Sequence, residues 1–180
     1  NKKASESKNL MEQTDVPEEK QKLEKSTIRI NKTHVDDLNH LFTLMGVQFV
    51  QPDGEAETYA AYLCKTNQVY GVYSEDMDTL SFGSPILIRK CIDRSIKRKD
   101  AISIFSLKDI LEGFNMNYEQ FVDVCILCGC DYCETISKIG NVRAFQAIQK
   151  HESLESFIST LEPSVLPPNY VQKSKKAKEL

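Results

Sequence analysis

Two short apolar runs, VQFV at residues 47–50 and VYGVY at residues 69–73, lie on either side of a helix-forming stretch at residues 55–66. Apolar runs of this length, bounded by turn residues, are typical of buried strands, and the alanines and leucine between them favour a helix. Strand, helix and strand in this order imply a parallel pair joined by a crossover helix. The sequence therefore predicts an α/β fold with a mainly parallel sheet and helices on both faces.

Further elements follow from the same patterns. PILIRK at 85–90 and AISIFS at 101–106 predict a β-hairpin with a basic loop between its strands. Apolar residues at helical spacing predict a helix from Thr33 to about Met45, and Gly46 suits the left-handed position after it. Beyond the hairpin the pattern is helical, so we expect a helical C-terminal part.

Acidic pairs follow both apolar runs: Glu55 and Glu57 the first, Asp76 and Asp78 the second. Ligands of open α/β sheets gather outside the carboxyl ends of the strands, so both pairs are expected at one edge. Crowded carboxylates raise each other's pKa unless a cation such as Mg²⁺ neutralises them. Each pair alone is also explained as acids favoured by a helix dipole. Both pairs together with Asp131 favour a metal site, and two ions about 3.5–4 Å apart can clamp a phosphodiester.

Basic side chains concentrate in two stretches, although the net charge is −3. RKCIDRSIKRK at 89–99 has six basic residues against one acid, and KSKKAK near the C-terminus adds four lysines. Cations beside concentrated carboxylates suit a protein that handles nucleic-acid phosphates. Arg89, Lys97, Arg98 and Lys99 are therefore candidate DNA contacts. A solvated loop explains the same charges, and this alternative stays open.

Four of the six cysteines lie in CILCGCDYC at 125–133, a spacing that raises the question of a zinc or iron–sulfur site. Cys125 and Cys128 are one turn apart in an apolar helix, where a free cysteine behaves as a small hydrophobe. Zinc sites usually take a second ligand pair from a distant segment. We expect Asp131 to be the functional residue here, with a sulfur-bound metal as the alternative.

Three segments, LMGVQFVQPDGEAE, YSEDMDTLSFGSP and FVDVCILCGCDYCETI, resemble in order and spacing the internal region of flap endonucleases. The resemblance covers about residues 28–162. It implies a 5′ nuclease or PIN-like fold and places the family's metal-binding carboxylates, with two Mg²⁺ ions for which Mn²⁺ can substitute, at Glu55, Glu57, Asp76, Asp78 and Asp131. Exonuclease-type and excision-repair-type relatives share E-A-E and D-x-D, whereas F-G-S-P and D-Y-C-E favour the flap endonuclease branch.

ETISKIGNVRAFQAIQKH at 134–151 resembles the family's helix–turn–helix, a helix–hairpin–helix-type element that grips duplex DNA and commonly holds K⁺. The resemblance implies DNA contacts at Lys138, Gly140 and Arg143. Lys138 replaces the family's first hairpin glycine, and Asn141-Val142 replace the Pro-Lys after the second. A positive φ at residue 138 would be costly for lysine. An ordinary helix pair is the alternative.

On this resemblance the chain divides into four parts: a polar lead-in leaving a helical arch at 1–27, a partial metal-binding nuclease core at 28–133, the DNA-binding helix–turn–helix at 134–162 and a basic tail at 163–180. The family's two further aspartates and its arch lysine and arginine cannot be placed in this sequence. Efficient catalysis by this chain alone is therefore not expected.

The resemblance implies a metal-dependent 5′ flap endonuclease and 5′–3′ exonuclease acting on branched DNA in replication and repair. Its expected partners are branched or flap DNA and, for the full-length protein, a sliding clamp, whose binding motif is absent here. A reducing, nuclear location is expected, with mitochondria as the second choice. The alternative is a DNA-binding module without activity. No apolar run approaches the roughly 18–20 residues of a membrane span, so no membrane partner is expected.

Overall fold

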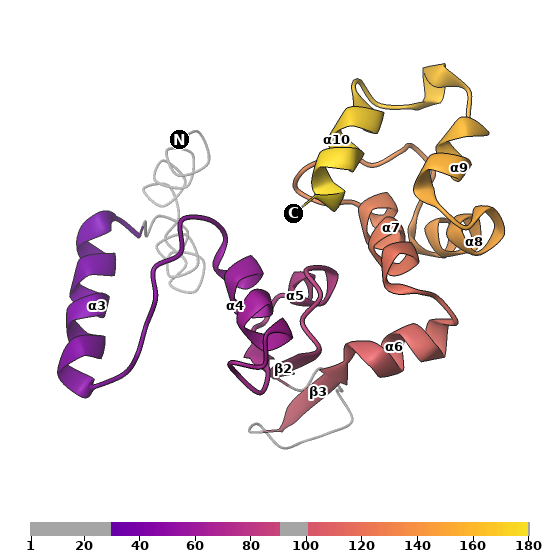
Figure 1. Cartoon of the computed structure of the whole chain (residues 1–180). Helices are drawn as coiled ribbons and strands as arrows, with labels where there is room; N and C mark the ends of the chain where they lie inside the picture. Colours follow the sequence, from indigo (N-terminus) through magenta and orange to yellow (C-terminus); the bar gives the residue numbers. More distant parts are fainter. Residues whose placement is uncertain (1–29, 91–100, 180) are drawn as a thin grey trace, which may run out of the picture. The chain divides into compact units, whose positions relative to one another are not determined.

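The computed structural model describes residues 30–90 and 101–179. The chain divides into two compact units, and the boundary between them along the sequence lies between Gln51 and Pro52. The first unit contains helix α3, Lys32–Met45 (Figure 1). The helix starts at Lys32, one residue before the predicted start at Thr33, and its capping box is formed by Asn31 and His34. Gly46 ends the helix in the left-handed conformation, with φ 68°, as predicted.

The predicted strand at 47–50 is wrong. These residues form no ladder with another described segment, and Val47, Phe49 and Val50 are 44%, 41% and 63% exposed. A strand is stabilised by a hydrogen-bonded neighbour and by burial of one face, and neither is present around VQFV in the described chain.

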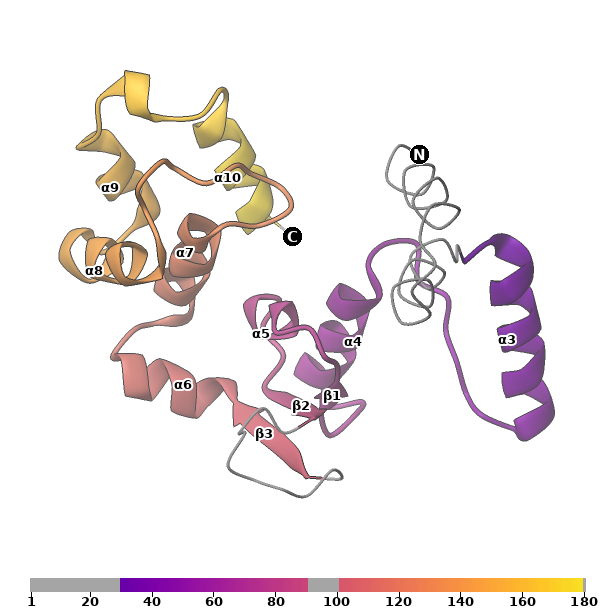
Figure 2. The ribbon, with the colours of Figure 1, turned by 180° about the vertical axis from the view of Figure 1, so that it is seen from behind.

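The second unit contains a three-stranded sheet in the order β1–β2–β3 (Figure 2). Its strands are β1 Val72–Tyr73, β2 Ile86–Lys90 and β3 Ile102–Ser106. β1 pairs with β2 in parallel, whereas β2 pairs with β3 antiparallel as the predicted hairpin. The α/β class is confirmed, and the sheet is mixed rather than mainly parallel because the hairpin supplies two of its three strands.

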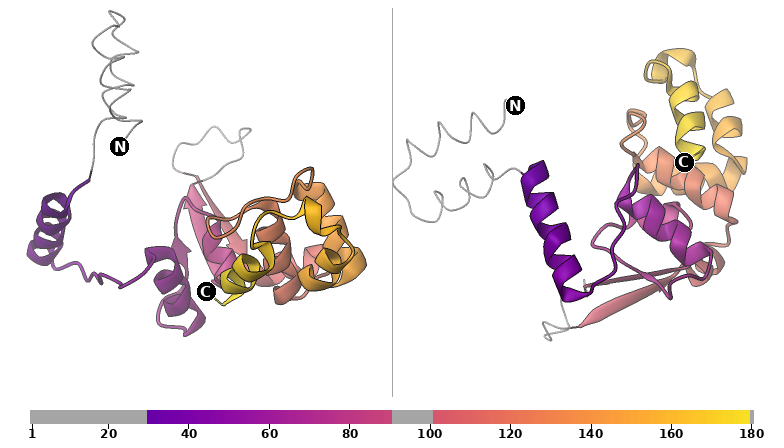
Figure 3. Two further views of the ribbon diagram at one scale, coloured as in Figure 1. Left: turned by 90° about the horizontal axis from the view of Figure 1, so that it is seen from above. Right: turned by 60° about the vertical axis from the view of Figure 1, so that its left-hand side comes forward.

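Some helices of the second unit contact this sheet, and the C-terminal ones pack together beyond it (Figure 3). The helices of this unit are α4 Ala56–Lys65, α5 Asp78–Ser81, α6 Leu107–Phe114, α7 Tyr118–Cys128, α8 Asn141–His151, α9 Leu154–Ser159, the 3₁₀ turn η1 Pro163–Val165 and α10 Tyr170–Lys178. Local signals set their starts: Ser106 Oγ accepts a hydrogen bond from the amide of Asp109, and Asn117 caps α7 through a capping box with Gln120. None of the helices in 30–90 and 101–179 is long and apolar enough to cross a membrane.

Two apolar clusters hold this unit together. A small one joins α5, β2 and α6 through buried Leu80, Leu87 and Leu107. A larger one fills the helical part and includes Ile126 and Leu127 of α7, Ala144 and Ile148 of α8, Leu154 and Phe157 of α9, and Tyr170 of α10. Because α7 contacts α5 as well as α8, α9 and α10, this helix connects the two clusters. The stretch described as a basic tail therefore contains a packed helix.

Two groups of expectations lie outside the described residues. The polar lead-in at 1–27 is one, and the basic residues Lys97, Arg98 and Lys99 between β2 and β3 are the other.

Candidate metal centre

The loop after β1 carries the first two candidate ligands. Ser74 continues the parallel ladder by donating its amide to the carbonyl of Ile88, at 3.1 Å. The Ser74 hydroxyl then accepts from the amide of Asp76, and Asp76 Oδ1 accepts from the amide of Asp78, each at 3.0 Å. Such side-chain-to-backbone bonds fix tight turns around Asp and Ser. The loop therefore holds Asp76 and Asp78 in a defined arrangement at the start of α5.

The base of this loop is anchored by buried contacts. Thr79 is fully buried and Leu80 is 2% exposed, so α5 is fixed against the sheet directly beside Asp78. At the other end of α5, the Tyr118 hydroxyl of α7 donates to the carbonyl of Ser81 at 2.7 Å. Tyr118 thereby ties α7 to the acidic loop, a role that its place in the sequence did not indicate.

The other three carboxylates come from two further segments. Glu55 is the N-cap residue of α4, and Glu57 lies in the first turn of that helix. Asp131 lies in the exposed turn that follows α7. Acids in the first turn of a helix also interact favourably with its dipole, so the structural explanation for Glu57 holds beside the functional one.

The charges of the other four candidate carboxylates all act on Asp78. The pKa of Asp78 is raised above its usual value by partial burial and then, in decreasing order, by the charges of Asp76, Asp131, Glu55 and Glu57. None of the five forms an ion pair with a cation in the described part of the chain. Their mutual repulsion is therefore uncompensated by the described residues.

The carboxylates do not by themselves make a closed ligand shell. Within residues 30–90 and 101–179 no three His, Cys, Asp or Glu side chains lie close enough together to hold one ion. The donor set nevertheless fits a hard divalent cation, because Mg²⁺ is bound through one or two carboxylates and keeps several waters. The arrangement is an open acidic site that an ion and its water would complete.

Tyr132, next to Asp131, belongs to the same site. Its pKa is raised to about 12, chiefly by a hydrogen bond from its hydroxyl to the carboxylate of Glu55. A hydroxyl that donates to a metal-binding carboxylate fixes the orientation of that ligand. Sequence reasoning missed this role, although the D-Y-C segment carried the residue beside the acid. Tyr132 and Asp78 both line a hollow of about 600 Å³ that extends along α7.

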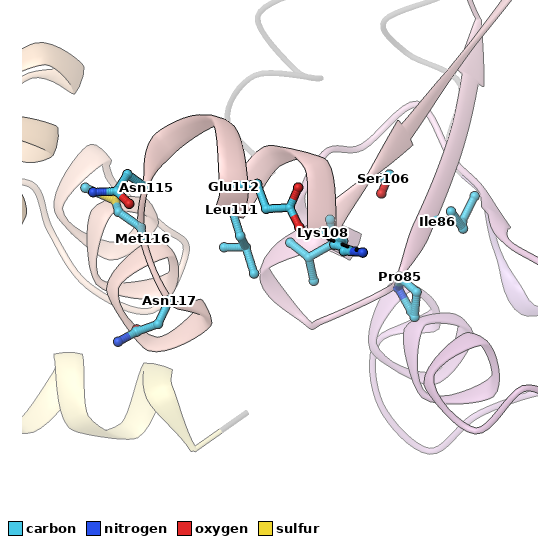
Figure 4. A pocket seen from close by; sticks show the side chains of 10 residues that line it. Pro85, Ile86, Ser106, Lys108, Leu111, Glu112, Asn115, Met116 and Asn117 are labelled. Atoms are coloured by element: carbon cyan, nitrogen blue, oxygen red, sulfur yellow. Dashed lines mark ion pairs between the residues drawn. The ribbon is translucent and has the colours of Figure 1, made fainter.

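A second hollow, of about 820 Å³, has no carboxylate of the site in its lining (Figure 4). It lies where β2 and β3 meet α6, and Leu107, Leu111 and Met116 give it an apolar character. Lys108 and Glu112, an i, i+4 ion pair on α6, lie at its rim. Glu112 is the one carboxylate in this lining and is paired with Lys108, so the hollow offers no cluster of acids to a divalent cation.

The sulfurs of 125–133 do not form a metal site. Cys125, Cys128, Cys130 and Cys133 are free thiols, and no three of them come together around one point. Burial raises the pKa of Cys125 and that of Cys133 to about 12, which opposes the thiolate that zinc requires. The carboxylate explanation of this stretch is therefore the stronger one.

The turn that carries Asp131 depends on Gly129. This residue has φ +114°, and a Cβ atom here would lie 2.7 Å from Cγ2 of Thr135. We expect Gly129→Ala to lower the free energy of unfolding by about 1–3 kcal/mol, through backbone strain and overlap. Chemical denaturation measures this. Gly54→Ala is the matched control, because its φ lies outside the left-handed region and its Cβ would meet open space, so it should change stability by less than about 0.5 kcal/mol. Equal losses for both variants would contradict the assignment.

The predicted DNA-binding residues lie in two places. Lys138 has φ 66°, so the hairpin requires the left-handed conformation where this chain has lysine. Arg143 donates to the carbonyl of Lys138 at 2.9 Å, and Gly140 is the N-cap of α8. All three are exposed. Arg89, in contrast, has only 16% of its side chain exposed and lies 3.7 Å from Glu75, so it is engaged within the chain.

The chain resembles known proteins over most of its length. Residues 46–131 match the XPG I-region family. Flap endonuclease 1 of Mus musculus is 43% identical over 158 residues, which are 87% of this chain and 42% of that protein. Flap endonuclease 1 of Glycine max is 44% identical over 155 residues, 85% of this chain and 40% of that protein. The chain thus spans about two fifths of the length of these relatives.

Solved structures agree with the sequence relatives. Flap endonuclease-1 from Methanococcus jannaschii superposes with a TM-score of 0.68 at 24% identity, over 83% of this chain and 45% of that one, which shows the fold. A eukaryotic junction-resolving enzyme, GEN-1, binding with potassium has a TM-score of 0.58 at 26% identity, over 79% of this chain and 35% of that one. The chain therefore matches the XPG I-region at residues 46–131 and is similar to flap endonucleases over most of its length.

Proposed function

We propose that this chain supplies part of the divalent-metal centre of a structure-specific 5′ flap endonuclease that cuts phosphodiester bonds in branched DNA. One observation carries the proposal: four carboxylates from three segments raise the pKa of Asp78, and no described cation compensates them. Folding that brings like charges together costs free energy, so a ligand that reverses the cost is expected. A binding module for DNA has no use for such a cluster, since the acids would repel phosphate.

Glu55, Glu57, Asp76, Asp78 and Asp131 would hold Mg²⁺, with Mn²⁺ as a substitute. The ions would supply Lewis acidity and an activated water for phosphodiester hydrolysis. The chain's own residues prepare the site. The Asx turn of Asp76 sets the position of Asp78, Tyr132 orients Glu55, and Tyr118 keeps α7, which precedes Asp131, against α5.

The hairpin between α7 and α8 would contact the DNA duplex. Gly140 leaves the first amides of α8 without a side-chain cap, and amides at a helix N-terminus suit phosphate. Lys138 and Arg143 would add positive charge beside them. The catalytic core of Rad2, which shares the fold, was solved in complex with a DNA substrate, and GEN-1 was solved binding with potassium. These complexes support DNA and K⁺ as ligands, and the place of K⁺ at the hairpin rests on the resemblance alone. A sliding clamp as partner of the full-length protein and a nuclear location are likewise proposed on the resemblance alone.

Single-turnover cleavage by the full-length protein tests the proposal. A 5′-flap substrate should be cut near its branch point only when Mg²⁺ or Mn²⁺ is present, and an unbranched duplex should be cut far more slowly. Binding of the flap substrate without cleavage at any concentration of either metal would favour the DNA-binding module instead.

Metal should stabilise the chain in a pH-dependent way. The folded pKa of Asp78 is raised above its unfolded value, so the stability it contributes is fully present below pH 3.8 and is lost as pH rises through the folded pKa. A bound cation reverses this loss at neutral pH. We therefore expect Mg²⁺ at about 100 times its Kd to add about 2.7 kcal/mol at neutral pH, and progressively less as the acids protonate.

Thermal unfolding with and without Mg²⁺, from neutral pH down to pH 3.8, measures this stabilisation. NaCl of equal ionic strength is the control and should not reproduce it. Equal stabilisation by both salts, or a Mg²⁺ effect that grows as pH falls, would contradict the prediction.

A further inference from the structure

The turn that carries Asp131 is closed by two cysteines. Cys130 and Cys133 face each other as an isolated antiparallel bridge, with Asp131 and Tyr132 between them. Their Sγ atoms are 3.4 Å apart. Residues directly opposed in an antiparallel pair have Cα atoms roughly 4.5–5.5 Å apart, within the range of disulfide-linked cysteines. The backbone is therefore already arranged for a bond between these sulfurs.

The two sulfurs differ in access. Cys133 is 5% exposed and packs in the helical core, whereas Cys130 is half-buried. Both line an open hollow of about 650 Å³, together with Asp131, Tyr132 and Lys173. An oxidant in this hollow reaches Cys130 first, and Cys133 is in place to react next. In the described chain no other pair of sulfurs is in contact.

We propose that Cys130 and Cys133 are a reversible oxidation site, and that their disulfide weakens cation binding at the neighbouring carboxylates. The effect on cation binding rests on the proposed metal centre. The oxidant is hydrogen peroxide. The Cys130 sulfur attacks the O–O bond, giving a sulfenic acid and one water. The Cys133 sulfur then displaces the sulfenic oxygen as a second water, so two thiols lose two electrons and two hydrogens as one S–S bond forms.

The consequence for the metal centre follows from what the turn carries. Bond formation draws the sulfurs from 3.4 Å to about 2.05 Å, so the turn between them tightens. Asp131 is one of the acids that act on Asp78, and Tyr132 holds Glu55. Ligand distances in a metal site tolerate shifts of only about 0.2 Å. Displacing both residues should weaken cation binding about 10-fold, a typical effect of disturbing groups that orient ligands.

The test uses hydrogen peroxide on the chain, with free thiols trapped by N-ethylmaleimide and peptides mapped by mass spectrometry without reductant. We expect one disulfide joining Cys130 to Cys133, formed in Cys128→Ser but absent from Cys130→Ser. Mn²⁺ affinity, measured by electron paramagnetic resonance, should fall about 10-fold on oxidation and recover with dithiothreitol. In Cys130→Ser, peroxide should leave the affinity unchanged.

Three results would overturn the proposal: oxidation that maps to other cysteines, no disulfide at all, or a Cys130–Cys133 disulfide with unchanged Mn²⁺ affinity. Failure of the metal centre itself looks different. The reduced chain would then bind no Mn²⁺, while peptide mapping would still decide whether the two sulfurs form a bond.

Discussion

Asp78→Asn in the full-length protein should reduce cleavage of a 5′-flap substrate by at least about 100-fold, the scale of losing one preorganised electrostatic contact to the reacting centre. The replacement keeps the size of the side chain and leaves its backbone amide free to donate to Asp76. What it removes is one negative charge from the point where all five carboxylates interact. The loss should appear in single-turnover rates, which report chemistry rather than product release.

Binding of the flap substrate should be unchanged or tighter in Asp78→Asn, because one charge that repels phosphate is gone. This separates a lost metal ligand from a misfolded protein. The matched control is Cys128→Ala with Cys130→Ala, which should cost on the order of 1 kcal/mol of stability per site through lost burial and leave cutting in reducing buffer intact. If the cysteine variant loses metal and activity while Asp78→Asn still cuts, sulfur rather than carboxylate holds the metal.

Lys178→Met should be the most destabilising change in the helical part, lowering the free energy of unfolding at neutral pH by about 3 kcal/mol. Lys178 of α10 forms ion pairs with Asp123 of α7 and, at 2.8 Å, with Glu155 of α9. Asp123 is 2% exposed, and its other oxygen accepts from the amide of Leu154 at 2.8 Å. Lys178 is thus the partner of the Asp123 oxygen that accepts no hydrogen bond from a neutral donor. Without Lys178, the buried Asp123 carboxylate carries an unpaired charge.

The pH dependence of this variant follows from Asp123. Burial already raises the pKa of Asp123, against the opposing effect of Lys178, so removing Lys178 should raise it further. A raised folded pKa means that the unpaired carboxylate is penalised at neutral pH and relieved when it binds a proton. The deficit of Lys178→Met should therefore shrink as pH falls below that pKa.

Denaturant unfolding of Lys178→Met beside Lys176→Met tests this, since Lys176 is an exposed lysine on the same helix. Lys176→Met should stay within about 0.5 kcal/mol of the parent. Similar losses in both variants, or a Lys178→Met deficit that grows in acid, would mean that Asp123 does not depend on this partner.

The sequence predicted elements best where local chemistry decides them. The left-handed Gly46 and the hairpin of β2 and β3 both depend on residues close in the chain, and both are confirmed. VQFV at 47–50 is apolar enough for a strand, but a strand also needs a distant partner, which periodicity does not reveal. Periodicity likewise does not reveal that β1 pairs with β2, so the mixed order of the sheet was not predicted.

The candidate site shows a similar division. Acidic pairs after apolar runs and the resemblance at Asp131 predicted which carboxylates to consider, and the charges of the other four raise the pKa of Asp78 after burial does. Tyr118 and Tyr132 were missed because their roles depend on which backbone or carboxylate their hydroxyls reach, a matter of tertiary packing. The Cys130–Cys133 contact was missed for the same reason, since spacing alone does not show that two sulfurs face each other across a turn.

The central claim is that the five carboxylates, and not the sulfurs, receive the divalent cation. Paramagnetic broadening of amide signals by substoichiometric Mn²⁺ tests it directly, because broadening falls off steeply with distance from the ion. We expect amides around Glu57, Asp78 and Asp131 to broaden first and together, and Asp78→Asn to weaken this pattern. Broadening that begins around Cys125 and Cys128, or is scattered over unrelated acids, would contradict it.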